Sequence, residues 1–148
     1  GNPEASIEKV QNSAYEARMT DDIKGFPDGL KTLVGERGIT LSGGQRQRTA
    51  LSRALLVDSK IIVLDDALAS VDNKTASAIL RTIKNQYSKT VLMISHQLSA
   101  AAACDRIIVM SDGKIVQEGT HKLLIKKEGL YKSMWEREKA KEQLQSDD

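Results

Sequence analysis

The sequence predicts an α/β fold in which a parallel sheet with flanking helices follows an all-helical segment. Three observations lead to this class: two short apolar runs at 61–64 and 91–94, and a helical pattern of apolar residues at 73–86 between them. A strand, a helix and a second strand in this order form a βαβ unit, whose strands pair in parallel. Because residues 61–64 contain no polar residue, we expect the first strand to be buried on both faces.

The segment ahead of the first strand predicts two helices and a long loop. Over residues 6–18, apolar residues recur at spacings of three and four, which is typical of an amphipathic helix; they are Ile7, Val10, Ala14 and Ala17. Glycine and proline are dense from Gly25 onward, and we expect residues 29–41 to form a loop. Ser42 can cap a second helix that ends near Leu56.

The rest of the chain predicts a hairpin and two helices. Residues 107–110 and 114–117 are apolar runs separated by a serine, an aspartate and a glycine, which favour a tight turn between two strands. Helical patterns follow at 123–127 and 130–145.

Composition excludes several classes of site. The single cysteine, Cys104, rules out an internal disulfide and a zinc site built from cysteines. The formal net charge of +2 is spread along the chain, so nothing in it calls for a nucleic-acid partner. No stretch approaches the roughly 18 consecutive apolar residues of a membrane-spanning helix.

Residues 41–48 have the features of a phosphate-binding turn. Ser42 is a polar cap, and Gly43 and Gly44 follow it at the start of a predicted helix, where backbone N–H groups point outward and the helix dipole is positive. A phosphate could bind there. Most serine-glycine-glycine turns do no more than begin a helix, so the turn alone leaves both interpretations open.

Polar side chains follow both strands of the predicted sheet. Asp65 and Asp66 come directly after the first strand, and His96 follows the second. Carboxylate oxygens suit a hard cation, although a strand-end aspartate is also common as a turn or cap residue. A histidine by itself is more often an ordinary polar residue.

Taken in order, these motifs resemble those of the ABC ATPase family. The octet at 41–48 is similar to the family's signature motif, residues 61–65 to its Walker B strand, and residues 69–72 to its D-loop; His96 occupies the place of its switch histidine. Residues 34–38 resemble a stretch that precedes the signature in the exporter branch. The resemblance covers essentially the whole chain.

The resemblance implies a role for each of these residues. Asp65 would hold Mg²⁺, and Asp66 and His96 would be catalytic. The residues implied in binding ATP are Leu41, Ser42, Gly43, Gly44, Gln45 and Asp72.

The resemblance also implies an architecture and partners. The fold would be an incomplete P-loop NTPase (RecA-like) sheet, with a helical subdomain at 1–56 and the C-terminal part of the ATPase core at 57–148. The partners would be a second nucleotide-binding domain and the transmembrane domain of a transporter, with no nucleic acid. The two nucleotide-binding domains would form a homodimer or a heterodimer, and the heterodimer is favoured. The expected location is the cytoplasmic side of the cell membrane.

The chain differs from the family pattern in two places, and each difference leads to a prediction. The chain has no Gly-x-x-x-x-Gly-Lys-Ser/Thr run, so by itself it is expected neither to bind ATP in the family's way nor to hydrolyse it. Asp66 stands where the family has a glutamate. The missing methylene moves the carboxylate by about 1 Å, which can cost on the order of 10²-fold in rate.

The alternative functions are a non-catalytic half-domain that docks on a complementary half, and an ATPase head of a DNA-repair or chromosome-structure protein.

Overall fold

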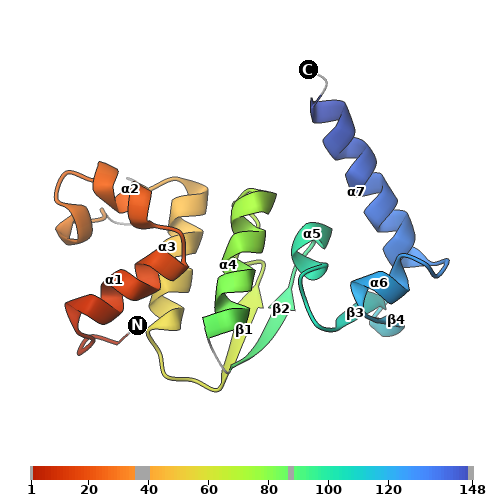
Figure 1. The fold of residues 1–148 in the computed structure, drawn as a ribbon, viewed down its shortest axis with the longest axis horizontal. Helices are drawn as coiled ribbons and strands as arrows, with labels where there is room; N and C mark the ends of the chain where they lie inside the picture. The colour runs from red at the N-terminus through yellow and green to blue at the C-terminus, as the bar shows by residue number, and fades with distance from the viewer. Residues whose placement is uncertain (1, 36–40, 87–88, 147–148) are drawn as a thin grey trace. The chain divides into compact units, whose positions relative to one another are not determined.

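The computed structural model describes residues 2–35, 41–86 and 89–146, which form two compact units, one within Gly1–His96 and one within Gln97–Asp148 (Figure 1). The elements of the first unit are α1 (Ile7–Glu16), α2 (Thr20–Gly25), η1 (Gly29–Lys31), α3 (Gly43–Leu55), β1 (Ile61–Asp65), α4 (Asn73–Gln86) and β2 (Thr90–Ile94). Those of the second unit are α5 (Leu98–Ala101), β3 (Ile107–Ser111), β4 (Lys114–Gly119), α6 (His121–Leu124) and α7 (Leu130–Ser146).

Helix α1 packs on α3 through small residues. The hydroxyl of Ser6 caps α1, which buries Ser13 and Ala14. The hydroxyls of Ser13 and Ser52 lie 3.0 Å apart in a buried hydrogen bond between the two helices. Ile7, which the sequence pattern placed on the apolar face, is 65% exposed. The buried face therefore begins later in the helix than the pattern predicted.

Helix α3 agrees with the sequence prediction, and the segment before it does so in part. The helix begins after Ser42 and is followed by Leu56 as its C-cap. Helix α2 was not predicted, because six residues with two aspartates and a glycine give no apolar periodicity. One turn of 3₁₀ helix, η1, lies within the predicted loop, and residues 36–40, which include part of the exporter-like stretch, lie outside the described residues.

The sheet of the first unit confirms the predicted βαβ order. Strands β1 and β2 pair in parallel, with Ile61 opposite Thr90 and Asp65 opposite Ile94, and α4 connects them. Because the strands are parallel, their carboxyl ends lie at the same edge of the sheet (Figure 1).

The prediction that the first strand is buried on both faces is wrong. Ile62 and Leu64 are 5% and 4% exposed, whereas Ile61 and Val63 are 61% and 59% exposed. Strand β2 alternates in the same way. An apolar side chain is buried only where another layer covers it, and the described part of the chain covers one face of this sheet.

The second unit has its own small core. Strands β3 and β4 pair antiparallel through a turn at Asp112 and Gly113, which both have positive φ, at 49° and 73°. Such a turn suits the twist of a hairpin. The core contains Leu98, Ile107, Val109, Leu124 and Tyr131. Helices α6 and α7 fall near the predicted ranges, whereas α5 was not predicted. No helix among the described residues has the length and hydropathy to cross a membrane.

Candidate functional site

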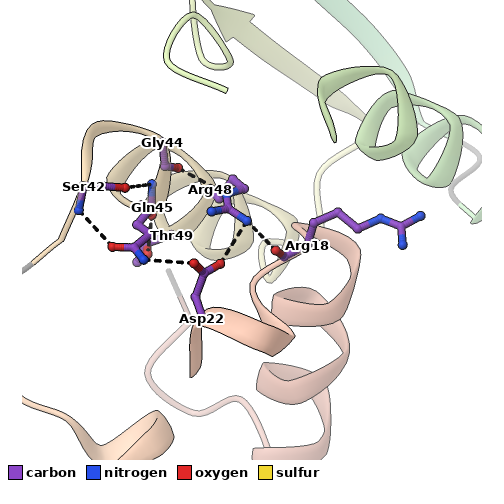
Figure 2. Close-up of polar contacts among 7 residues, drawn as sticks. All are labelled: Arg18, Asp22, Ser42, Gly44, Gln45, Arg48 and Thr49. Carbon is purple, nitrogen blue, oxygen red and sulfur yellow. Dashed lines mark hydrogen bonds and ion pairs between the residues drawn. The ribbon is translucent and has the colours of Figure 1, made fainter. Parts of the chain in front are cut away.

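Helix α3 begins with a complete capping box (Figure 2). The Ser42 hydroxyl accepts a hydrogen bond from Gln45 N at 3.2 Å, and Gln45 Oε1 accepts one from Ser42 N at 2.9 Å. This reciprocal pair satisfies two of the amides that the first turn of a helix leaves without an intrahelical partner.

Two further amides at this helix start have no acceptor among the residues that the structure describes. The first intrahelical bond runs from Arg46 N to Ser42 O, so the N–H groups of Gly43 and Gly44 precede it. None of the residues that the structure describes accepts a hydrogen bond from either glycine. Ser42 is exposed and the two glycines are partly so. The start of α3 therefore offers two polarised N–H groups to an anion.

The same helix start packs against the segment that follows β1. A Cβ atom at Gly44 would lie 2.8 Å from the carbonyl oxygen of Ser70, so only glycine permits this approach. Gln47 bridges to the same segment, since its Oε1 accepts from Ser70 N at 2.7 Å and its Nε2 donates to Asp66 O at 3.3 Å. Gln47 was not among the site residues predicted from the sequence. Its spacing of three from Gly44 places both on one helix face, which is the signal that could have identified it.

The strand ends bring an acid and a histidine together. His96 Nε2 lies 4.0 Å from Asp66 Oδ2, and the two side chains are 93% and 48% exposed. Asp66 adopts φ of 46°, a left-handed conformation that aspartate tolerates better than most residues, and its N–H donates to Ile94 O. A carboxylate beside an imidazole can orient a water molecule and accept its proton.

Asp65 ends β1 with an exposed side chain. Within the described ranges, no three histidine, cysteine or acidic side chains gather closely enough to hold a metal ion. One carboxylate at a strand end nevertheless fits Mg²⁺, which commonly takes one or two protein ligands and completes its shell with water and phosphate oxygens.

Two other predicted site residues have structural roles. The Asp72 carboxylate accepts a hydrogen bond from Thr75 N at 2.9 Å and so caps α4. This bond to the Thr75 backbone lowers the pKa of Asp72. The Leu41 side chain is buried at 8% exposure, and its carbonyl accepts from Arg46. Any contact of Leu41 with a ligand would thus involve its backbone.

Comparisons with known proteins show which family this chain resembles. Residues 2–69 match the family described as ABC transporter. The chain is 43% identical over 148 residues to the multidrug resistance-like ATP-binding protein MdlA of Buchnera aphidicola subsp. Schizaphis graminum, covering 99% of this chain and 26% of that protein. It is 45% identical to the ATP-dependent lipid A-core flippase of Photobacterium profundum, covering 86% of this chain and 21% of the flippase.

A solved structure supports the fold as well as the family. A bacterial Atm1-family ABC exporter with ATP bound superposes with a TM-score of 0.86 at 37% sequence identity, over 93% of this chain and 24% of the exporter chain. The chain thus spans about a quarter of the length of the proteins it matches. The predicted incomplete P-loop NTPase fold is confirmed. The chain belongs to the ABC transporter family and corresponds to part of an exporter-type nucleotide-binding domain.

Proposed function

We propose that this chain is part of the ATP-driven motor of an ABC exporter and that the start of α3 binds the phosphates of an ATP molecule held by a second nucleotide-binding domain. The observation that carries the proposal is the pair of N–H groups on Gly43 and Gly44, which lack acceptors among the described residues and lie beside an exposed Ser42. Backbone amides at the positive end of a 13-residue helix suit a phosphate. Gln45 holds Ser42 in place.

The ends of β1 and β2 would form the hydrolytic side of a second site. Asp65 would be the Mg²⁺ ligand, and the bound ion would neutralise charge on the phosphate oxygens. Asp66 would hold the attacking water and accept its proton. His96 lies close enough to Asp66 to assist in this proton transfer. Because the Asp66 carboxylate is one methylene shorter than the family's glutamate, this site is slow. The partner domain would then supply the faster site, which favours a heterodimer.

The remaining parts of the proposal concern the complete protein. The matched relatives include proteins named for multidrug resistance and a lipid A-core flippase, and on this basis we propose that the complete protein serves export. The motor would dock on a transmembrane domain at the cytoplasmic side of the membrane. Within the 148 residues there is no phosphate-loop sequence, so this chain alone would be inactive.

Replacing Ser42 tests the phosphate-binding role separately from the capping role. Aspartate and asparagine both cap helices about as well as serine, but only aspartate places a negative charge where the phosphate would bind. We expect Ser42→Asp to lower the ATP turnover of the complete exporter by on the order of 10²-fold, as when an oxyanion donor is removed, while Ser42→Asn retains much more. The 148-residue chain, assayed beside them, should give no turnover. Equal activity of the Ser42→Asp and Ser42→Asn exporters would refute the proposal.

A further inference from the structure

An acidic side chain from α2 reaches the start of α3. Asp22 Oδ1 accepts a hydrogen bond from Gln45 Nε2 at 2.9 Å, and Asp22 Oδ2 lies 2.9 Å from Arg48 Nη1 (Figure 2). The side chains of Asp22 and Arg48 are only 18% and 17% exposed. One carboxylate is therefore held by two side chains, about one helical turn apart on α3.

The contact with Asp22 determines which way the Gln45 amide faces. Gln45 Oε1 accepts from Ser42 N, which leaves Gln45 Nε2 to face α2. An ionised carboxylate only accepts hydrogen bonds. If the amide turned over, oxygen would face oxygen at Asp22, and the NH₂ group would face the N–H of Ser42. Asp22 thus favours the amide orientation that closes the capping box.

Arg48 neutralises the negative charge that Asp22 places near the start of α3. A carboxylate near the positive end of a helix competes with any other anion for the same field. Arg48 neutralises Asp22, and it is itself fixed because its Nη1 also donates to Arg18 O at 2.6 Å (Figure 2). Asp22 can therefore orient Gln45 without leaving a net negative charge beside the amides of Gly43 and Gly44.

We propose that Asp22 is a positioning residue for the phosphate-binding turn, acting through Gln45 to hold Ser42 and the two glycine amides in place. The inference rests on the proposed function and concerns the same site. Asp22 belongs to α2, a helix that contributes none of the residues proposed to touch nucleotide. Its effect on turnover would come from the geometry it imposes on α3.

An exchange of the amide and the carboxylate tests this contact. In Asp22→Asn, one carbonyl oxygen must serve two donors, and in Gln45→Glu, two carboxylates face each other. The double variant combines both substitutions and leaves the total charge unchanged. Its side-chain amide at position 22 would donate to the new carboxylate at position 45 and would accept from Arg48 through its oxygen. The carboxylate at position 45 would still accept from Ser42 N, so every contact of the parent is restored, with donor and acceptor exchanged only between positions 22 and 45.

Asp21→Ala is the matched control for these variants. The side chain of Asp21 is 97% exposed and pairs with Lys24 on the same helix. Its removal therefore takes an acid from α2 without touching the contact between Asp22 and Gln45.

In the complete exporter, we expect each single variant to lower kcat for ATP on the order of ten-fold, less than the loss of a direct donor, with a smaller change in KM. The double variant should recover most of that loss, and Asp21→Ala should match the parent. A double variant no more active than Gln45→Glu would overturn the inference, as would turnover that follows the melting temperature across the variants. If Ser42→Asp is inactive and the double variant still fails, the positioning role alone is wrong. If Ser42→Asp is as active as Ser42→Asn, the proposed function is wrong.

Discussion

The start of α3 and the ends of β1 and β2 both carry residues of the proposed nucleotide sites, but they are organised differently. At the start of α3, the polar groups of Gln45, Gln47 and Arg48 bond to neighbours within the unit. At the strand ends, Asp65 and Asp66 are exposed, His96 is 93% exposed, and His96 Nε2 lies 4.0 Å from Asp66 Oδ2. The turn is therefore preorganised by the chain's own contacts, whereas the strand-end side chains would be ordered by what binds to them.

This difference has a physical basis in where the partners come from. The capping box of α3 joins two residues only three positions apart, so its geometry is local. The strand ends meet only because the two strands pair in register, and that pairing sets backbone positions without fixing exposed side chains. Substitutions at the turn should therefore act on stability as well as activity, and those at the strand ends mainly on activity.

The largest expected effect is on the strand-end side. Replacing Asp66 with glutamate moves the carboxylate outward by about 1 Å, and we expect turnover at this site of the complete exporter to rise by up to on the order of 10²-fold. The positive φ of Asp66 suits glutamate less well, so a loss of stability of about 1 kcal/mol should accompany the gain. Steady-state ATPase assays and thermal unfolding measure the two changes.

Asp66→Asn is the control for that substitution. Asparagine keeps the shape of the side chain and tolerates a left-handed backbone, but it cannot accept a proton from water. It should abolish the remaining turnover of the site at unchanged stability. If the glutamate variant leaves both the turnover and its asymmetry between the two sites as they were, Asp66 does not limit the rate.

A smaller effect, on stability, is expected where α3 meets the segment after β1. An alanine at Gly44 would bring Cβ to 2.8 Å from the Ser70 carbonyl, so the backbone must move; we expect unfolding of the chain to become easier by about 1–3 kcal/mol. Gly43→Ala is the matched control, because its Cβ would lie 3.4 Å from the nearest Ser70 atoms. Urea unfolding of both variants makes the comparison. Equal midpoints would mean that the close approach at Gly44 is not maintained in solution.

The smallest effect concerns the cap of α4. Asp72→Ala removes the acceptor for Thr75 N and should cost about 1 kcal/mol at neutral pH. The hydrogen bond holds the pKa of Asp72 below its ordinary value of about 3.9. The stabilisation is therefore complete above that value and is lost as the pH falls through the lower, folded-state pKa. Urea midpoints from about pH 7 down to about pH 2 should converge for the parent and the alanine variant, while Asp72→Asn stays capped throughout. A constant gap over that range would contradict the ionised cap.

Local patterns were enough to predict most elements but not what surrounds them. Helix α4 matches its predicted range because its apolar residues repeat at the helical period, and Ser42 was identified as a cap from residue type alone. The same reasoning missed α2 and α5, which are too short to show a period. It also placed Ile61 and Val63 in a buried layer, since their apolar character does not reveal whether a second layer is present.

The amino-acid sequence by itself determined the order of the longer elements, the family and the residue types at each proposed site, because periodicity, capping and motif spacing act over short stretches of chain. Only the tertiary structure decided that Asp22 reaches Gln45, that Gly44 lies against Ser70, and that Asp66 and His96 are neighbours. Each of these contacts joins residues that are far apart in the sequence. Their distances depend on how helices and strands pack, and packing is a property of the whole unit rather than of any segment within it.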